Sequence, residues 1–265
     1  MNLRILGSGT SHGIPVIACA CPVCRSEDFR DQRMRSSLYV QGAAGERAVI
    51  DTGPEFRLQA IRAGITRLDG LFLTHAHADH LHGLDDIRPL CQDKPLPVYA
   101  DANTMREMRE RFAYIFQKTQ IGGGKPRITP VIAAEPIRLG HLIFTPLPVK
   151  HGTLDILGWK IQEGPASATY LTDTSDIPPG AFSLIGQPQA VIIGGLRERP
   201  HETHFSFLQA LTAAARTKTS QIYLTHICHD HSHQSIEAFC RLWQKSSGFI
   251  GAAQPAYDEL TISLL

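Results

Sequence analysis

The sequence predicts an α/β fold in which two β-sheets pack face to face and helices cover both outer faces. Short apolar runs that read as strands form two sets along the chain, and helix-like segments flank them. No apolar run reaches the length of a membrane span. Several strand-like runs are followed directly by a histidine or an aspartate, which predicts a polar site where the strands end.

The strand-like runs cover residues 3–6, 38–41, 48–51, 71–73, 97–99, 142–147, 168–171, 191–193, 222–225 and 260–262. The helix-like runs cover residues 55–63, which Gly64 ends, 103–117, 205–216 and 235–245. Residues 122–126 (GGGKP) follow the second helix-like run and are predicted to form a mobile loop before the next strand.

The composition is that of a compact enzyme. The 265 residues are 43% hydrophobic, and no linker, repeat or charge block divides them, so we expect one domain over residues 1–265. The net charge of +1 gives no basic excess for binding many phosphates of a nucleic acid. The N-terminal apolar run is too short for a signal peptide, which predicts a cytoplasmic protein.

A glycine pattern near the N-terminus superficially suggests a dinucleotide-binding loop. Gly7, Gly9 and Gly13 have part of the required spacing, but such a loop must open a helix. Pro15 and a cysteine cluster follow here instead, so no nucleotide cofactor is expected.

Residues 75–80 are the most informative stretch, because they place four metal-binding side chains in six residues. Side chains alternate in an extended chain, so His75 and His77 point the same way and can share one metal ion. Asp79 and His80 come after the turn and can reach a second ion a few ångströms away. Imidazole and carboxylate suit zinc, iron or manganese. A chance histidine-rich surface turn is the alternative, but it gives these residues no common purpose.

Three further candidates come directly after strand-like runs, namely His151, Asp173 and His226. Each of them alone would more often be a satisfied polar residue at a strand end. Together with residues 75–80 they provide enough ligands for two coordination spheres, because a carboxylate can bridge two ions.

Three thiols lie close together near the N-terminus, at Cys19, Cys21 and Cys24. Disulfides are the alternative for a secreted protein, but cytosolic glutathione keeps thiols reduced. Three clustered thiolates predict a structural zinc site that one distant histidine closes. His229, three residues beyond His226, is the expected fourth ligand and would tie the N-terminal loop to the metal-bearing edge.

The H-x-H-x-D-H pattern, followed by a distal His, Asp and His, resembles the metallo-β-lactamase superfamily over residues 51–226. The resemblance implies an αββα sandwich with the metals at one edge. It implies one ion bound by His75, His77 and His151, a second bound by Asp79, His80 and His226, and Asp173 as the bridge. Asp51 is then expected to accept N–H bonds that fix the histidine loop. True class B β-lactamases lack the His80 equivalent, so antibiotic hydrolysis is disfavoured.

Within this superfamily the chain resembles the PhnP-like cyclic phosphodiesterases. The C-x-C-x-x-C loop and the late H-x-x-H pair carry the resemblance, and residues 7–10 (GSGT) and 33–37 (RMRSS) agree with it. His204 resembles the histidine with which this family contacts the scissile phosphate. Residues 105–136 match nothing in the family core, so the resemblance defines the type of reaction better than it defines the substrate.

The resemblance implies hydrolysis of a small cyclic phosphodiester, of the 5-phosphoribosyl 1,2-cyclic phosphate or 2′,3′-cyclic nucleotide type. Two active-site cations, Mn²⁺ or Zn²⁺, would lower the pKa of a bridging water from about 15.7 towards about 7 and provide hydroxide. The expected catalytic residues are Asp79 and His204, with His204 as general acid or imidazolium contact to phosphate. A supporting hydrogen bond remains the alternative role for His204.

The expected cofactors are these two ions and one structural Zn²⁺, and the expected partner is a small phosphorylated substrate. No stable nucleic-acid or membrane partner is expected, and a homodimer remains open. Three other functions also remain open. An RNA-processing nuclease would normally carry an RNA-gripping arm, and a thioester or lactone hydrolase would have no clear use for His204. A PqqB-like cofactor-biosynthesis protein shares the fold and the cysteine site, but the complete ligand set counts against it.

Overall fold

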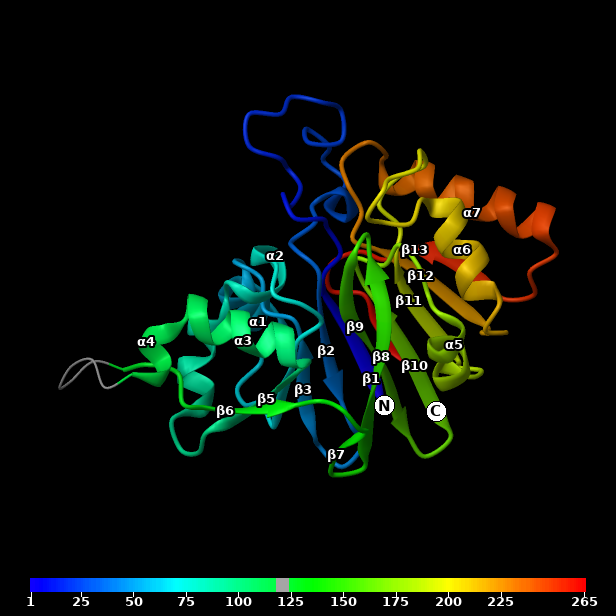
Figure 1. Ribbon diagram of the computed structural model, residues 1–265. Coiled ribbons are helices and arrows are strands. Elements are labelled where there is room, and N and C mark those ends of the chain that lie inside the picture. Colours follow the sequence, from blue (N-terminus) through cyan, green and yellow to red (C-terminus); the bar gives the residue numbers. More distant parts are fainter. Residues whose placement is uncertain (118–123) are drawn as a thin grey trace.

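The computed structural model describes residues 1–117 and 124–265, which form two seven-stranded mixed sheets with helices on both outer faces (Figure 1). This architecture confirms the predicted fold class. Of the predicted loop at residues 122–126, Gly122 and Gly123 lie outside the described residues.

The first sheet has the strand order β14-β1-β2-β3-β4-β5-β6. Its strands are β1 (Asn2–Gly7), β2 (Ser37–Gln41), β3 (Arg47–Ile50), β4 (Gly70–Phe72), β5 (Leu96–Ala100), β6 (Ile128–Ile132) and β14 (Thr261–Ser263). The second sheet has the order β13-β12-β11-β10-β9-β8-β7. Its strands are β7 (Ile137–Leu139), β8 (Leu142–His151), β9 (Leu154–Glu163), β10 (Ala166–Leu171), β11 (Ala190–Gly194), β12 (Gln221–Thr225) and β13 (Ala252–Pro255).

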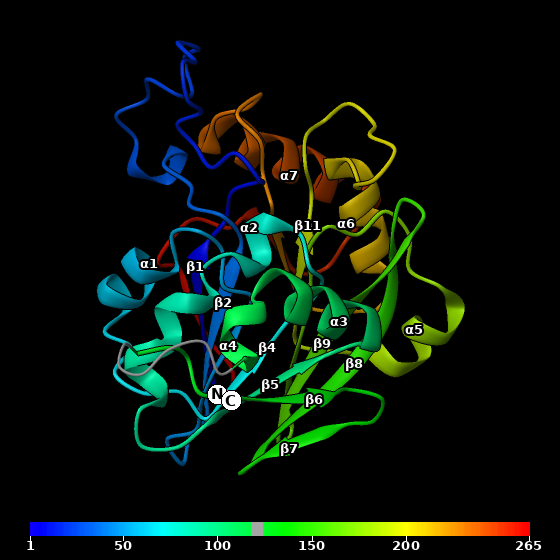
Figure 2. The same cartoon turned by 60° about the vertical axis from the view of Figure 1, so that its left-hand side comes forward.

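The helices divide between the two sheets, as the two views together show (Figure 2). Beside the first sheet lie α1 (Phe56–Ala63), α2 (Ala78–Leu81), α3 (Ala102–Arg111), α4 (Ala113–Phe116) and the 3₁₀ helix η2 (Leu84–Cys91). Beside the second sheet lie α5 (Pro179–Ile185), α6 (Phe207–Ala215) and α7 (His233–Ser247). The 3₁₀ helix η1 (Phe29–Asp31) belongs to the N-terminal loop.

Both faces of each sheet are buried, which explains why the central strands read as nearly continuous apolar runs. In β2, Leu38 and Val40 pack between the sheets, whereas Tyr39 packs on the helix side of the first sheet. In β11, Ile192 faces the other sheet and Val191 faces the helices of the second sheet. This alternation is the expected period of two in an extended chain.

The strand directions bring several strand ends to one edge of the sandwich. The pairs β3-β4, β4-β5 and β5-β6 are parallel in the first sheet, as are β10-β11, β11-β12 and β12-β13 in the second. The strand β8 runs in the same direction as β10, because β9 is antiparallel to both. We call the place where β3, β4, β8, β10 and β12 end the site edge. Both chain termini lie at the opposite end of the sheets (Figure 1).

The predicted strands all fall on observed strands, with ends shifted by one or more residues, but four observed strands were not predicted. These are β6, β7, β9 and β13. The predicted helix over residues 103–117 is two helices, because Phe112 leaves the helical region with φ −111° and ψ 38°. The predicted helix over residues 205–216 begins only at Phe207, where the Ser206 side chain caps it. Among the helices of residues 1–117 and 124–265, none has the length and apolar character needed to cross a membrane.

Candidate active site

The seven predicted ligands of the dinuclear site all lie at the site edge. The turn after β4, residues 74–80, carries four of them, and we call it the His loop. His75 and His77 precede α2, while Asp79 and His80 lie within this one-turn helix. The other three are His151 at the last position of β8, Asp173 just after β10 and His226 directly after β12.

Three residues at these strand ends have a left-handed backbone. The φ angles are 64° at Asp51, 53° at Asp173 and 54° at His226. This conformation is uncommon for residues other than glycine and persists only where the surrounding structure fixes it. The sharp turn lets each strand end while its last polar side chain stays inside the molecule, since all three side chains are buried.

The potential ligand atoms form two neighbouring groups. One group consists of His75, His77 and His151, and its ligand atoms lie within 4.8 Å of one another. The second group, equally close, consists of Asp79, His80, Asp173 and His226. The structure therefore brings together all seven residues that the sequence predicted as ligands of a dinuclear site.

Asp173 lies between the two groups. Its Oδ1 is 3.1 Å from His80 Nε2 and 3.0 Å from His226 Nδ1, whereas its Oδ2 is 3.9 Å from His75 Nε2. One carboxylate oxygen thus faces each group, which is the geometry a bridging carboxylate needs.

Hydrogen bonds behind the histidines fix which ring nitrogen faces the site. Asp51 accepts from the Thr74 backbone N–H at 2.8 Å, from Thr74 Oγ1 at 2.7 Å and from His80 Nδ1 at 2.8 Å. Because the Thr74 hydroxyl donates to Asp51, its oxygen accepts from His75 Nδ1 at 3.0 Å. The Nε2 atoms of His75 and His80 are then the unprotonated nitrogens available to a metal.

His151 and His226 also have oxygen partners outside the two groups. The Thr203 carbonyl lies 2.7 Å from His151 Nδ1. The hydroxyls of Ser36 and Thr10 lie 3.2 Å from the Nδ1 and the Nε2 of His226, respectively. These contacts reach the site edge from segments that are distant in sequence.

The donor set fits divalent metal ions. The Nε2 atoms of His75 and His80 are buried, and among the described residues neither makes a hydrogen bond, although carboxylate oxygens of Asp79 and Asp173 lie 3.1 Å from His80 Nε2. Burial favours a neutral His80, but Asp173, Asp79 and Asp51 raise its pKa well above the usual value. In the chain alone, a proton on His80 therefore balances part of the negative charge of these buried carboxylates. A cation shared by imidazole and carboxylate ligands satisfies both the unpartnered nitrogens and this negative charge.

His204 lies beside both ligand groups. Its ring centroid is 4.6 Å from that of His151 and 4.9 Å from that of His226, with which it stacks at 19°. Its Nδ1 is buried and lies 4.0 Å from Asp173 Oδ2. Burial and the neighbouring His226 lower the pKa of His204 to about 3. The ring is therefore neutral near pH 7 in the chain alone, which differs from the imidazolium that the sequence suggested as one role.

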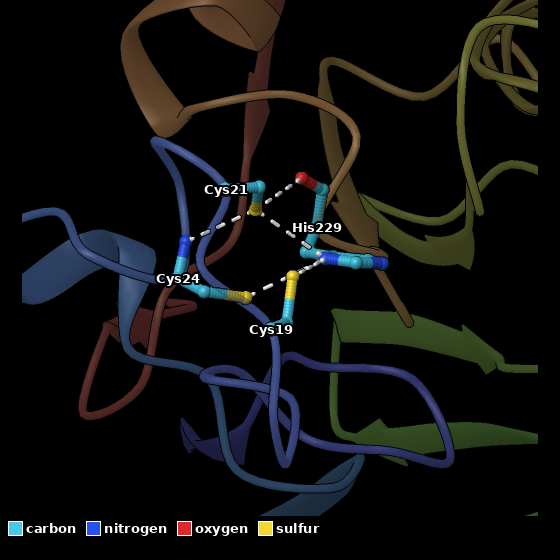
Figure 3. A group of neighbouring side chains, drawn as sticks. All are labelled: Cys19, Cys21, Cys24 and His229. Carbon is cyan, nitrogen blue, oxygen red and sulfur yellow. Dashed lines mark hydrogen bonds between the residues drawn. The ribbon is translucent and has the colours of Figure 1, made fainter.

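The predicted thiol site also comes together in space (Figure 3). The Sγ atoms of Cys19, Cys21 and Cys24 lie 3.4, 3.5 and 3.4 Å from His229 Nδ1. The Cys24 backbone N–H lowers the pKa of the Cys21 thiol to about 6, against the effect of burial. Three sulfur atoms around one imidazole nitrogen, with one thiol already acidic, form a donor set suited to tetrahedral zinc. We call these four residues the thiolate cluster.

A buried ion pair holds the loop that joins the thiolate cluster to the active-site ligands. The Arg33 guanidinium donates to the Cys228 carbonyl at 3.0 Å and to the His231 carbonyl at 3.3 Å. It also donates to Asp31 at 2.9 Å, and Asp31 accepts from the His233 backbone N–H at 2.6 Å. Both side chains are almost fully buried, so this pair fixes the loop over residues 226–233 independently of any metal.

The segment that had no counterpart in the sequence resemblance packs beside the His loop. Arg111, at the end of α3, donates to the carbonyl of Ala76, which lies between His75 and His77. The Phe112 ring meets His82 edge-on at a centroid distance of 5.9 Å. Arg111 and Phe112 of this segment thus lie beside the His loop and the residue that follows α2.

Several residues that support this site were given no role from the sequence, although Thr10, Arg33 and Ser36 lie in the segments 7–10 and 33–37 that agreed with the resemblance. They are Thr10, Arg33, Ser36, Thr74, Arg111 and Thr203. One signal was available, because a buried threonine directly precedes His75, Asp173 and His226. The remaining contacts come from single side chains in loops or at the end of α3, of which Thr10, Arg33 and Ser36 are buried, or from the backbone carbonyl of Thr203, and these leave no such pattern.

The fold and the donor set define the class of protein, and comparison with known proteins agrees. Residues 46–227 match the model of the Beta-lactamase superfamily domain. The crystal structure of a diphosphatase from the PhnP family is 36% identical to the chain, with a TM-score of 0.86, and the match covers 98% of this chain and 96% of that one. The chain therefore belongs to the metallo-β-lactamase superfamily and, within it, to the PhnP family. At this level it is a hydrolase of that superfamily with a site for divalent metals such as Zn²⁺.

Two other similar proteins differ in how much of their own length this chain matches. A curated octanoyltransferase of Porphyromonas gingivalis is 39% identical over 231 residues, which are 86% of this chain but only 46% of that protein. This chain thus spans less than half of that relative's length. The Zn²⁺-bound PqqB structure from Methylobacterium extorquens covers 100% of both chains with a TM-score of 0.80, but at 16% identity it supports the fold alone.

Proposed function

We propose that the protein hydrolyses a small cyclic phosphodiester, of the phosphoribosyl cyclic phosphate or 2′,3′-cyclic nucleotide type. The position of His204 beside both ligand groups carries the proposal. Breaking a P–O bond to a sugar releases a basic oxygen that needs a proton, and an imidazole at this place can donate one. The similarity to a PhnP-family diphosphatase supports chemistry at phosphorus.

In this proposal the two ligand groups hold two divalent ions, Mn²⁺ or Zn²⁺, and Asp173 is shared between them. When bound, the ions neutralise phosphate charge and make water a stronger nucleophile near neutral pH. The chain supplies the fixed geometry. Asp51 and Thr74 hold His75 and His80 with their Nε2 atoms towards the site, so little reorganisation is needed when a substrate arrives.

His204 would then act on the substrate. The negative charge of a bound diester raises the pKa of His204 from its low value in the chain alone. Its N–H can therefore donate to a phosphate oxygen and pass a proton to the leaving group. In the balanced reaction, the oxygen of water joins phosphorus, the P–O bond to the sugar breaks, and the released sugar oxygen ends protonated.

A phosphoanhydride is a second candidate substrate, favoured by the similarity to a diphosphatase. The leaving group of such a substrate is a phosphate, which needs no proton near neutral pH. The dependence of the rate on His204 therefore distinguishes a sugar diester from a phosphoanhydride.

The substrate test compares six compounds with Mn²⁺ and with Zn²⁺. They are bis-p-nitrophenyl phosphate, a 2′,3′-cyclic nucleotide, 5-phosphoribosyl 1,2-cyclic phosphate, a nucleoside diphosphate, an octanoyl thioester and a tRNA precursor. We expect turnover of a cyclic diester and poor cleavage of the RNA, because a net charge of +1 offers little attraction for many phosphates. Cleavage of the precursor or the thioester without action on any cyclic phosphate would contradict the proposal.

The His204→Ala variant tests the catalytic role. Its rate on a cyclic diester should fall by about 10²–10⁴-fold, the usual range for a lost proton donor, with unchanged metal content. The loss should be smaller on bis-p-nitrophenyl phosphate, whose leaving group needs no proton. His141→Ala is a matched control, because His141 is exposed in the turn before β8. An equal loss on both substrates would assign His204 to phosphate binding instead of proton donation.

A further inference from the structure

We infer that His201 is a positioning residue: its side chain fixes a turn that orients His151 and places His204 beside the metal ligands. The inference rests on the proposed function only for the roles of these two histidines. The geometry of the turn itself is independent of the substrate.

The turn is closed by the His201 ring. The Thr203 backbone N–H donates to His201 Nδ1 at 3.3 Å, and the Thr203 hydroxyl lies 3.2 Å from the same nitrogen. An acceptor side chain that binds the N–H two residues later is the arrangement that Asn and Asp use in Asx-turns. Partial burial and the nearby Arg197 lower the pKa of His201, which favours the neutral ring that can accept.

Thr203 transmits this constraint to a predicted metal ligand. Its carbonyl lies 2.7 Å from His151 Nδ1, and a carbonyl can only accept. His151 therefore carries its proton on Nδ1 and keeps Nε2 free for a metal. A Cβ atom at Gly152 would come 2.9 Å from Thr203 Cγ2, so the glycine lets Thr203 pack closely on the turn after β8.

The same turn leads directly into His204. The His201 and His204 ring centroids are 5.3 Å apart. The base of this loop is fixed on both sides, because the Leu196 N–H donates to the Phe205 carbonyl at 3.0 Å and the Phe205 N–H donates to the Thr174 carbonyl at 2.8 Å. The His201–Thr203 turn therefore sets how the loop returns from its exposed part to the site edge.

The test distinguishes two roles of His201, namely a hydrogen-bond acceptor within the turn and a direct contact with the substrate. His201→Ala removes the acceptor and should weaken the affinity of the ion at the group of His75, His77 and His151 by about 10–100-fold, the range seen when the partner of a metal-bound histidine is lost. His201→Asn should retain the affinity within about threefold, because its amide oxygen can accept from the Thr203 N–H in an Asx-turn. Competition with a chelator, using Zn²⁺ and Mn²⁺ separately, measures both affinities without any substrate. His141→Ala should leave them unchanged.

The rate on a cyclic diester should follow the same order, with kcat of His201→Ala reduced and that of His201→Asn close to the unaltered protein. The inference is overturned if His201→Ala leaves the metal affinities unchanged. It is also overturned if the Asn variant is as impaired as the Ala variant, since the ring would then act in some way other than as a turn acceptor. If no diester is turned over, the proposed function fails, yet the affinity measurements still decide the role of His201.

Discussion

Asp173 is the residue on which a two-ion site depends. Its two carboxylate oxygens face different ligand groups, one towards His80 and His226 and the other towards His75. The other predicted ligands lie within one group or the other. Burial would raise the pKa of Asp173, but the neighbouring histidines His226 and His80 lower it, so the side chain is an anion in this setting. A bridging role follows from this charge and this position.

Replacing Asp173 by Ala should therefore lower the occupancy of both active-site ions and abolish hydrolysis. Asp79→Ala should also abolish hydrolysis, but through one ion only, because Asp79 belongs to a single group. Metal analysis of dialysed protein measures both effects. Asp155→Ala is the matched control, because that carboxylate is 80% exposed and pairs only with Lys150 among the described residues. A fully active Asp79→Ala protein would disprove the dinuclear assignment.

Site residues could be identified from the sequence where several potential ligands lie close together along the chain. Four potential ligands in six residues predicted the His loop, and the thiolate cluster could be proposed because its three thiols also lie within six residues. Thr203 could not be identified, since it acts through a backbone carbonyl on a histidine 52 positions earlier. A carbonyl is present at every residue and leaves no mark in the sequence.

At the scale of elements, the N-terminal loop depends on the thiolate cluster. Among the described residues, only a small apolar group around Ile14, Val23 and Cys24 packs inside this loop. Beside the Arg33–Asp31 pair, this group buries little apolar surface to offset the conformational entropy lost when the loop is ordered. Binding of zinc by the cluster would supply part of the folding free energy of this loop.

Cys21→Ser should therefore lose one zinc ion per chain and melt at a lower temperature, whereas turnover should fall only indirectly through the nearby His226. Zinc analysis beside a melting curve checks this. Cys91→Ser is the control, because Cys91 is the buried last residue of η2 and accepts from the Arg127 N–H at 3.1 Å. That variant should keep its zinc even if its stability falls. Unchanged zinc content in Cys21→Ser would show that this thiol is not a ligand.

A buried histidine at the start of α7, His233, should make the stability of the protein depend on pH. His233 is buried there against Tyr257, and burial together with the nearby Arg30 lowers its pKa from 6.5 to about 4. Between these two values the unfolded chain binds a proton that the folded chain does not, so stability falls as the pH falls from 6.5 to 4.

His233→Phe should lack this pH-dependent loss. When the pH is lowered from 7 to 4, the unaltered protein should lose roughly 2–4 kcal/mol more of its free energy of unfolding than His233→Phe does. Denaturant unfolding at both pH values measures the difference. His141→Phe should follow the unaltered protein, and parallel curves for His233→Phe would contradict the argument.

Strands were predictable where both faces are buried and the run is uninterrupted, as in β11 and β12. The strand β6 was missed because it contains Pro130, and it lies at the edge of its sheet, where a missing N–H is tolerated. The strand β9 contains Asp155 and Gly158, which interrupt its apolar pattern. A Cβ at Gly158 would come 2.4 Å from a side-chain atom of Leu171, so packing against β10 requires this glycine and the local pattern does not reveal it.

At the scale of the whole molecule, topology and charge act together. Strands from both sheets end at the site edge, and they bring Asp51, Asp79 and Asp173 into one buried region. Burial of several carboxylates costs free energy unless cations compensate them. The site edge should therefore be less stable without metal ions, and ion binding should be coupled to folding of the whole sandwich.

Saturating the active site should raise the melting temperature. At a free-ion concentration of 100 times the dissociation constant, binding to the folded state alone adds about 2.7 kcal/mol. For a chain of this size that corresponds to a rise of roughly 5–10 °C. Thermal unfolding with Zn²⁺ or Mn²⁺, after a chelator has emptied the active site but left the thiolate cluster loaded, measures the rise. The rise should be much smaller in Asp173→Ala and unchanged in Asp155→Ala. An equal rise in all three proteins would place the stabilising ion somewhere other than the site edge.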